Sequence, residues 1–564
     1  MFAIPTMKLT PAKRWLLAAI PILFLGLFFV YPILTIFKIS LFPEGHFDAE
    51  SLRALWQKPY YLRVIWFTIW QAALSTLGAL ALGLPAAYIF ARFQFPGKKL
   101  LRALVTLPFV MPTVVAATAF IALIGPRGLL NQALMGILHL SDPPILLIHT
   151  LGIILLAHVF YNASVIIRMV GGFWANMDPR QEAAAAMLGA GPWQRLRHIT
   201  LPLLAPALLA ASLIVYLFNF TSFGVILILG GPGFATIEVE IYRTAVRLFN
   251  LPVAAALSIV QMLFTLTMMV VYTRLQQKMT VPQEFQAAGR TQRPPRTPGE
   301  KALVVGVFAL LGAFLISPLI ALVIQSFTLG GGVSLDFYRA LFVNRTNSIF
   351  FVTPIEAVRN SLAFATVTIL FSVIIALPAA YLLAEPARRR FSLARLLDPL
   401  FMLPLGTSAV TLGFGYIVAL NRPPLNLRAS LLIVPIAHTL IAFPFVLRAI
   451  LPVLRGMNPH LREAAQMLGA NTLSVLRHID LPILRRALLV GVVFAFTISM
   501  GEFSASLLVT RPQFPTLPVA IYRLLGQPGV SNFGQAVAMS VILMLVTAIG
   551  YIAIENLRTG GEEF

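Results

Sequence analysis

Long runs of apolar residues, separated by short polar and basic segments, dominate the hydropathy pattern of this chain. A membrane-spanning helix needs about 20 predominantly apolar residues, and twelve runs are long enough. The expected spans cover residues 15–37, 64–91, 103–124, 145–170, 203–229, 251–273, 302–325, 357–384, 399–420, 430–448, 483–510 and 535–555. The pattern therefore predicts an all-α, polytopic membrane protein with about 12 transmembrane helices.

A polar stretch at residues 274–301 is the clearest interruption of this pattern. It is rich in proline and basic residues, and it has too little apolar surface to fold by itself. Six apolar runs precede it and six follow it. We therefore expect a first half at residues 1–273, a linker at 274–301 and a second half at 302–564.

Composition agrees with a membrane protein and excludes several kinds of site. Apolar residues make up 59% of the 564 residues and charged residues 11%, whereas a soluble domain carries roughly 25% charged residues. Because the chain has no cysteine, disulfides, iron–sulfur clusters and thiolate metal sites are excluded. The net charge of +22 would suit nucleic acid, but in so apolar a chain we attribute it to membrane orientation. We expect the lipid bilayer, and no nucleic acid, as a partner.

The distribution of Lys and Arg predicts the orientation. If the N-terminus is cytoplasmic and the twelve spans alternate, the cytoplasmic segments carry 28 of the 42 basic residues and the outer segments carry 14. This bias has the sign of the positive-inside rule. Both termini are therefore expected in the cytoplasm.

The chain contains an internal repeat. Residues 177–202 align without gaps to residues 457–482, and 14 of these 26 positions are identical at an offset of 280. Further upstream, the sequence LPAAY occurs at 84–88 and again at 377–381. Because each half holds an even number of spans, the halves should be parallel and related by a pseudo-symmetry axis along the membrane normal. Such a pair implies a pathway between two pseudo-symmetric six-helix halves.

Each copy of the repeat predicts a helix, a turn and a second helix between the fourth and fifth spans of its half. Small residues give the first helix a smooth surface, a glycine suits the turn that ends it, and a Leu-Pro pair opens the next span. We interpret the copies as docking loops on the cytoplasmic face; the alternative is an ordinary amphipathic connector. The candidate residues are Glu182, Ala184, Ala185, Gly189, Leu201 and Pro202 in the first loop, and Glu463, Ala464, Ala465, Gly469, Leu481 and Pro482 in the second.

The order E-A-A, then Gly, then I-x-L-P resembles the coupling loop of permeases in binding-protein-dependent ABC importers. Three further segments resemble the fused permeases of the ferric iron and thiamine branch more narrowly. These segments are Gly-Gly-Pro at 230–232, TIEVEIYR at 236–243 and SMGEF at 499–503. The resemblance covers both halves and nearly the whole chain.

The resemblance implies a permease subunit that moves substrate, ferric iron or thiamine, by alternating access. It also implies two copies of a cytoplasmic ABC ATPase at the loops, an extracytoplasmic substrate-binding protein, and a location in the bacterial or archaeal plasma (inner) membrane. The chain itself would then be no enzyme and would hold no cofactor. In agreement, no G-x-x-x-x-G-K-[ST] phosphate-binding loop occurs in the sequence.

The two loops differ in one spacing. Glu463 precedes its glycine by six residues, as in the family, whereas Glu182 precedes its glycine by seven and aligns with Arg462. One helical position corresponds to about 100° of rotation. We therefore expect the two carboxylates to point in different directions, and Glu463→Ala to impair ATPase association more than Glu182→Ala.

Polar residues within the expected spans are candidates for a translocation path. Glu502 aligns with Ser222, and Ser499 aligns with Asn219. Within each span the two residues, 219 and 222 or 499 and 502, are three positions apart and share a helix face. The alternative is structural: Glu502 pairs with a neighbouring helix or caps an interrupted one.

Other polar residues favour ordinary roles. His158 and His438 occupy matched spans and are interpreted as packing residues; the alternative is a role in transport. Glu238 and Glu240 are interpreted as part of a solvated outer loop; the alternative is contact with the binding protein. Two other classes of membrane protein would need polar residues of a different kind. A secondary transporter driven by an ion gradient would need several mid-membrane carboxylates, and Glu502 is the one good candidate. A membrane-embedded enzyme would need a cluster such as H-E-x-x-H, which the sequence lacks.

Overall fold

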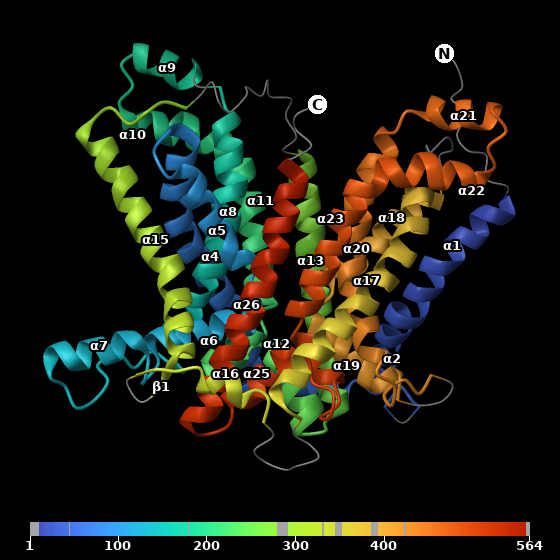
Figure 1. Ribbon diagram of the computed structural model, residues 1–564, viewed down its shortest axis with the longest axis horizontal. Helices are drawn as coiled ribbons and strands as arrows, with labels where there is room; N and C mark the ends of the chain where they lie inside the picture. Colours follow the sequence, from blue (N-terminus) through green and yellow to red (C-terminus); the bar gives the residue numbers. More distant parts are fainter. Residues whose placement is uncertain are drawn as a thin grey trace.

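The computed structural model describes residues 11–43, 45–178, 180–278, 292–329, 332–343, 352–384, 393–421 and 425–559. Part of the expected linker, residues 279–291, lies outside the described residues. The described structure is almost entirely helical, as the apolar pattern predicts (Figure 1). A two-residue antiparallel pair joins Thr328 to Val333.

The elements of the first half are α1 (Pro11–Leu25), η1 (Gly26–Val30), α2 (Tyr31–Leu41), α3 (Glu50–Gln57), α4 (Pro59–Arg92), α5 (Lys98–Val110), α6 (Thr113–Ile124), α7 (Leu129–Leu138), α8 (Leu151–Asn176), α9 (Arg180–Met187), α10 (Pro192–Arg195), η2 (Leu196–Thr200), α11 (Leu201–Phe220), η3 (Ile226–Gly230), α12 (Ile237–Tyr242), η4 (Arg243–Arg247) and α13 (Leu251–Lys278).

The elements of the second half are α15 (Pro298–Ser326), β1 (Thr328–Leu329), β2 (Gly332–Val333), α16 (Asp336–Ala340), α17 (Pro354–Ala384), α18 (Leu393–Met402), η5 (Leu403–Gly406), α19 (Ala409–Ala419), α20 (Ile433–Gly456), α21 (Pro459–Met467), α22 (Thr472–Val475), η6 (Leu476–Asp480), α23 (Leu481–Gly501), α24 (Ser504–Val509), α25 (Leu517–Leu525) and α26 (Val530–Thr559).

Eleven helices in the described part of the chain are long and apolar enough to span a membrane, or twelve if one bent pair counts as a single span. The expectation of about twelve spans is thus confirmed, but two expected spans are not continuous. The span expected at 399–420 is bent by 99° between Leu397–Gly406 and Ala409–Ala419. Ser408 caps the second piece by accepting from Val410 N at 3.1 Å and Thr411 N at 3.3 Å.

The span expected at 103–124 is also divided, between α5 and α6. Met111 there has extended backbone angles, φ −72° and ψ 141°. The residue before a proline avoids the helical region, and Pro112 follows Met111. The apolar segment counted as a possible span is Thr113–Leu138, which also contains α7. A hydropathy pattern alone does not show these breaks, because the apolar character continues through them.

The two halves pack alike and interlock. In the first half α4 packs on α8, and in the second α17 packs on α20. The approach of α4 to α8 is so close that a Cβ at Gly83 would lie 2.7 Å from Ile166 Cγ2. The first helices reach across: α15 packs against α5 and α6 of the first half as well as α26 of its own. In the same way, α1 packs against α17 of the second half, and α2 packs against α19 of the second half and α13 of its own.

Both copies of the sequence repeat lie on one face of the helix bundle. Figure 1 shows α9 and α21 at the top, far apart, with the described ends of α1 and α26 on the same side. The short helices α12, α19 and α25 lie at the opposite end. This arrangement separates the candidate docking loops from the region where the halves meet through short helices.

Candidate functional site

The two loops share one helix-ending geometry. Gly189 and Gly469 have φ of +84° and +85°, a region that favours glycine. In the first loop, Ala190 N donates to Ala185 O at 3.0 Å and Gly189 N donates to the carbonyl of residue 186 at 3.0 Å. The second loop repeats both bonds at the same distances, from residues 470 and 469. This pattern is a Schellman motif, and it explains why each sequence copy carries a glycine there.

Each turn exposes two apolar side chains. Met187 and Leu188 are both 90% exposed, and Met467 and Leu468 are both 89% exposed. Exposed apolar side chains side by side at a projecting turn are typical of a protein–protein interface. Sequence reasoning missed them, although the signal was present: M-L-G-A is identical in the two copies.

Glu182 ties the first loop to the membrane helices. Its carboxylate accepts from Arg92 Nη2 at the end of α4, at 2.5 Å, and from Thr200 Oγ1 before α11, at 2.8 Å. Glu463 lies elsewhere on its helix and contacts His460 Nδ1 at 3.0 Å. The two carboxylates therefore have different surroundings, as the one-residue displacement predicts. The relative loss of ATPase association in Glu463→Ala and Glu182→Ala stays a prediction.

The second loop is tied down with the charges reversed. Arg462, which aligns with Glu182, donates from Nε to Asp480 Oδ1 at 2.8 Å. Asp480 aligns with Thr200, and it also accepts from the Tyr381 hydroxyl of α17 at 2.6 Å. The Arg462 side chain is 19% exposed and that of Asp480 is 1% exposed. Each loop is thus clamped to its own half. The first copy uses an ion pair to Arg92 and a hydrogen bond from Thr200, and the second uses the ion pair of Arg462 with the buried Asp480.

The buried clamp predicts unequal sensitivity to mutation. Removing one partner of a buried ion pair costs about 3–5 kcal/mol, because the other charge stays uncompensated. Asp480→Ala should therefore loosen α21 by about that amount. Thr200→Ala removes one hydrogen bond to a carboxylate that keeps Arg92, a loss of roughly 1.5–3 kcal/mol at most. Hydrogen exchange of the α9 and α21 amides measures both effects. Equal acceleration of exchange in the two variants would contradict this assignment.

The candidate path residues surround two matched histidines. In the first half, His158 Nε2 lies 2.8 Å from Ser222 Oγ, and its Nδ1 lies 2.9 Å from Ser75 Oγ. In the second half, His438 Nδ1 lies 2.8 Å from Ser499 Oγ. Both histidines are buried, at 2% and 0% exposure. Hydroxyl partners on both ring nitrogens fit the packing role expected for these residues.

Asn219 belongs to the first of these networks. It is fully buried, its side-chain oxygen accepts from Asn162 Nδ2 at 2.7 Å, and its amide donates to Thr76 Oγ1 at 3.3 Å. Its repeat partner Ser499 donates to Thr368 Oγ1 at 3.3 Å. The structure thus brings each pair of aligned residues into a helix–helix hydrogen-bond network. A role of Asn219, Ser222 and Ser499 in translocation stays a prediction.

Glu502 caps a broken helix. Its carboxylate accepts from Ala505 N at 2.7 Å, Ser506 N at 2.8 Å and Ser506 Oγ at 2.7 Å, and lies 3.4 Å from His438 Nε2. The residue is 8% exposed and stands between α23 and α24. Of the two interpretations drawn from the sequence, the structural one describes this geometry. Contact between Glu502 and a transported substrate stays a prediction.

Two stacked phenylalanines mark the pseudo-symmetry axis. The rings of Phe223 and Phe503 are stacked, with centroids 5.7 Å apart, and the two residues are related by the offset of 280. A residue that touches its own repeat copy must lie at the axis relating the copies. Tyr242 packs edge-on against Phe223 at 5.7 Å, and its copy Tyr522 packs against Phe503 at 5.5 Å.

This aromatic cluster is largely buried at the axis. Phe223, Phe503 and Tyr242 are 3%, 2% and 8% exposed, and Tyr522 is half-buried. The cluster follows directly on the candidate path residues 222 and 502. It belongs to the end of the bundle that holds α12 and α25, away from α9 and α21 (Figure 1). Sequence reasoning named the polar neighbours of these phenylalanines and missed the rings, since apolar residues within apolar spans carry no distinct signal.

The expectation of a solvated loop face at Glu238 and Glu240 is wrong. Both are 1% exposed. Glu238 accepts from Ser408 Oγ of the second half at 2.7 Å and from Gln261, so it joins the halves. Burial raises the pKa of the Glu238 carboxyl to about 7, and the hydrogen bonds from Ser408 and Gln261 act in the opposite direction. Glu240 accepts from the Tyr60 hydroxyl at 2.8 Å.

No metal site emerges from the part of the chain that the structure describes, where no three His, Asp or Glu residues are grouped to hold an ion. The polar clusters found there are helix–helix and capping networks. The candidate functional features are therefore two exposed docking loops, their clamps, and an aromatic closure at the axis.

Comparison with known proteins identifies the family. The family described as "Binding-protein-dependent transport system inner membrane component" matches residues 79–281 and residues 376–559. The two matched segments each contain one copy of the loop, and together they cover more than half of the chain.

Three full-length relatives extend this likeness. The chain is 27% identical over 515 residues to the thiamine transport system permease protein ThiP of Escherichia coli (strain K12), covering 90% of this chain and 92% of that protein. It is 28% identical over 508 residues to ThiP of Brucella abortus (strain 2308), covering 90% and 89%. It is 26% identical over 505 residues to the probable ABC transporter permease protein y4fN of Sinorhizobium fredii, covering 88% and 87%.

Proposed function

Because the chain belongs to the family of binding-protein-dependent transport system inner membrane components, we propose that its two halves enclose the path of a thiamine-importing ABC transporter. The chain is a multi-pass inner membrane protein and the permease subunit of an ABC importer.

The ATPase subunits bind the loops in this proposal. Both loops lie on one face, and each exposes a Met-Leu pair at a rigid turn. The loops are anchored to the span-forming helices α4, α11 and α17 by the clamps of Glu182 and Asp480. Movement of an ATPase can therefore be transmitted to the spans. Because one chain carries two loops, two ATPase copies bind each permease chain in this proposal. The face that carries the loops is then the cytoplasmic face.

The observation that carries the substrate proposal is the aromatic cluster at the axis. Thiamine has two flat aromatic rings, one of which is a permanent cation. Aromatic faces attract such cations by about 0.5–2 kcal/mol each, depending on how well water is excluded. Phe223, Phe503, Tyr242 and Tyr522 would offer such faces at the axis once their contacts with one another open. The thiamine permeases among the relatives support the same substrate.

The cluster also supports a direction of access. The two halves meet through α12, α25 and the stacked rings at the end opposite the docking loops. In this arrangement the path is closed on the outer side. Parting of Phe223 from Phe503, driven by ATPase closure beneath the loops, would admit substrate from the binding protein.

Reconstitution tests the function. The purified chain in proteoliposomes should neither hydrolyse ATP nor accumulate thiamine. Adding the ATPase of the same transport system, with ATP and the substrate-loaded binding protein, should produce both activities together. Ferric iron provides the comparison arm. ATP-dependent uptake of iron without uptake of thiamine would show that iron, and not thiamine, is the substrate. Uptake that persists without any ATPase would contradict an ABC mechanism.

A further inference from the structure

A polar cavity opens on the second half, at the end opposite the docking loops. Its volume is about 680 Å³, and it lies between described residues of the segment that follows α19, at 421 and 426–429, and the segment joining α24 to α25. Its polar lining consists of Asn421, Asn426, Arg428, Thr510, Arg511 and Gln513. The described lining thus holds two guanidinium groups and no carboxylate. Within the described part of the chain, neither arginine makes an ion pair.

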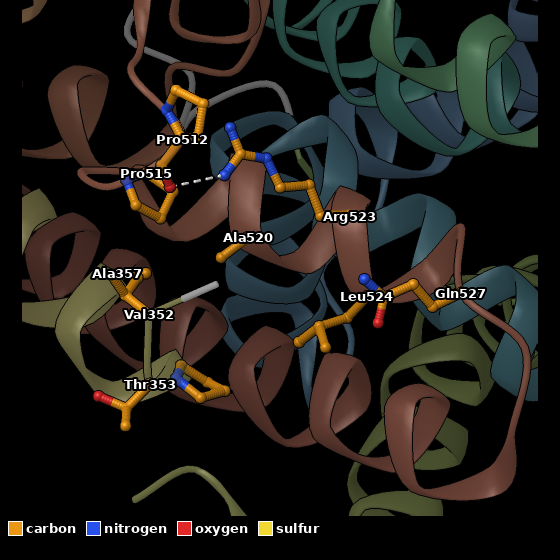
Figure 2. A pocket seen from close by; sticks show the side chains of 10 residues that line it. Val352, Thr353, Ala357, Pro512, Pro515, Ala520, Arg523, Leu524 and Gln527 are labelled. Atoms are coloured by element: carbon orange, nitrogen blue, oxygen red, sulfur yellow. Dashed lines mark hydrogen bonds between the residues drawn. The ribbon is translucent and has the colours of Figure 1, made fainter. Parts of the chain in front are cut away.

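The wall that carries Arg511 is held rigidly from behind. Arg523 of α25 donates from Nη1 to the carbonyl of Pro512 at 3.1 Å, as Figure 2 shows. Beyond it, Leu517 N donates to Ser361 Oγ of α17 at 2.7 Å. These bonds hold the backbone on both sides of Pro515, so this wall of the cavity is fixed before any ligand arrives. A preformed site spares a ligand the entropy of ordering it.

The first half places different residues at the equivalent positions. By the offset of 280, Arg428 corresponds to Ile148 and Arg511 to Gly231. There the two segments are joined directly, since His149 N donates to Leu229 O at 2.9 Å. The His149 side chain also fills the space next to Gly231, where a Cβ would lie 2.4 Å from its Nδ1. Two guanidinium groups in a cavity therefore distinguish the second half from the first.

We propose that this cavity receives a carboxylate-bearing loop of the substrate-binding protein and fixes the orientation in which that protein docks. The proposal rests on the proposed function, which supplies the partner and makes this the outer face. Guanidinium groups bind carboxylates through paired hydrogen bonds of defined direction. A permease with two similar halves offers its binding protein two similar orientations. A charged cavity on one half alone makes one orientation more stable than the other.

Charge reversal tests the cavity. The full transporter, with its ATPase, is placed in lipid nanodiscs, and the affinity of the loaded binding protein is measured by interferometry. Arg428→Glu combined with Arg511→Glu should weaken binding at least tenfold. It should also flatten the salt dependence, because the attraction between opposite charges is lost. Lys58→Glu, an equal charge reversal at an exposed residue at the start of α4, should leave affinity within about twofold.

Two further arms keep the test decisive. Arg428→Lys with Arg511→Lys keeps the charge but not the paired geometry, and should give an intermediate loss. Basal ATPase activity should be unchanged in all variants, which shows that the complex is folded. Wild-type affinity in the charge-reversed variant would overturn the proposal. A second result would also overturn it: the wild type binds pyrophosphate tightly, the charge-reversed variant does not, and both bind the binding protein equally well. The cavity would then be a small-anion site.

The failure of this proposal is distinguishable from the failure of the proposed function. If the wild-type transporter neither binds the binding protein nor responds to it with faster ATP hydrolysis, the function itself is contradicted. If the wild type responds and the charge-reversed variant responds equally, only the docking role of the cavity is lost.

Discussion

Replacing Leu188 and Leu468 together by aspartate should abolish ATPase association and uptake. Each leucine projects from a turn with about nine-tenths of its surface exposed, and each loop is tied to the spans behind it. Burying a leucine side chain in a partner contributes about 1.5–3 kcal/mol, and a carboxylate in the same place leaves an unpaired buried charge. The double substitution should therefore weaken ATPase binding by several orders of magnitude. Co-elution of ATPase and permease in size-exclusion chromatography, with uptake assays, measures the loss.

Matched variants separate lost docking from misfolding. Leu188→Met with Leu468→Met keeps apolar volume and should retain association. Because Leu188 and Leu468 are 90% and 89% exposed, the aspartate variant should insert and fold normally. Normal ATPase association by the folded aspartate variant would show that docking uses another surface.

Opening the aromatic stack should convert the protein into a leak. Phe223→Ala with Phe503→Ala removes the two rings that meet at the axis. Truncating a buried Phe to Ala lowers the stability of a protein by about 3–5 kcal/mol. Here, much of that loss should come from lost contact between the two halves. Thiamine should then pass through proteoliposomes without ATP, and ATP hydrolysis should no longer depend on the binding protein.

The control for this prediction lies on α11. Phe218 also contacts another phenylalanine, Phe109, but is 43% exposed, so Phe218→Ala should leave the membrane tight. If the double alanine variant is unstable, Phe223→Leu with Phe503→Leu keeps most of the volume and should give a smaller leak. A tight membrane in every stack variant would place the closure elsewhere.

The sequence by itself determined the membrane class, the number of spans, the duplication and the two loops. These features are linear: a span is a run of apolar residues, and a repeat is visible as identity at a constant offset. The turn glycines were also predictable. A residue with left-handed backbone angles at the end of a helix favours glycine, whatever surrounds it.

Only the tertiary structure decided which polar residues pair and where the halves meet. Glu238 is a buried link between the halves rather than a solvated residue, because its partner Ser408 lies far away in the other half. Glu502 caps α24 because the helix breaks there and its partners lie beyond the break. The reversed clamp of Arg462 and Asp480 likewise depends on α17 lying beside α23. Phe223 and Phe503 are ordinary apolar residues until the pseudo-symmetry places each against its copy. Contacts between distant segments carry no signal in hydropathy, so three-dimensional packing alone assigns them.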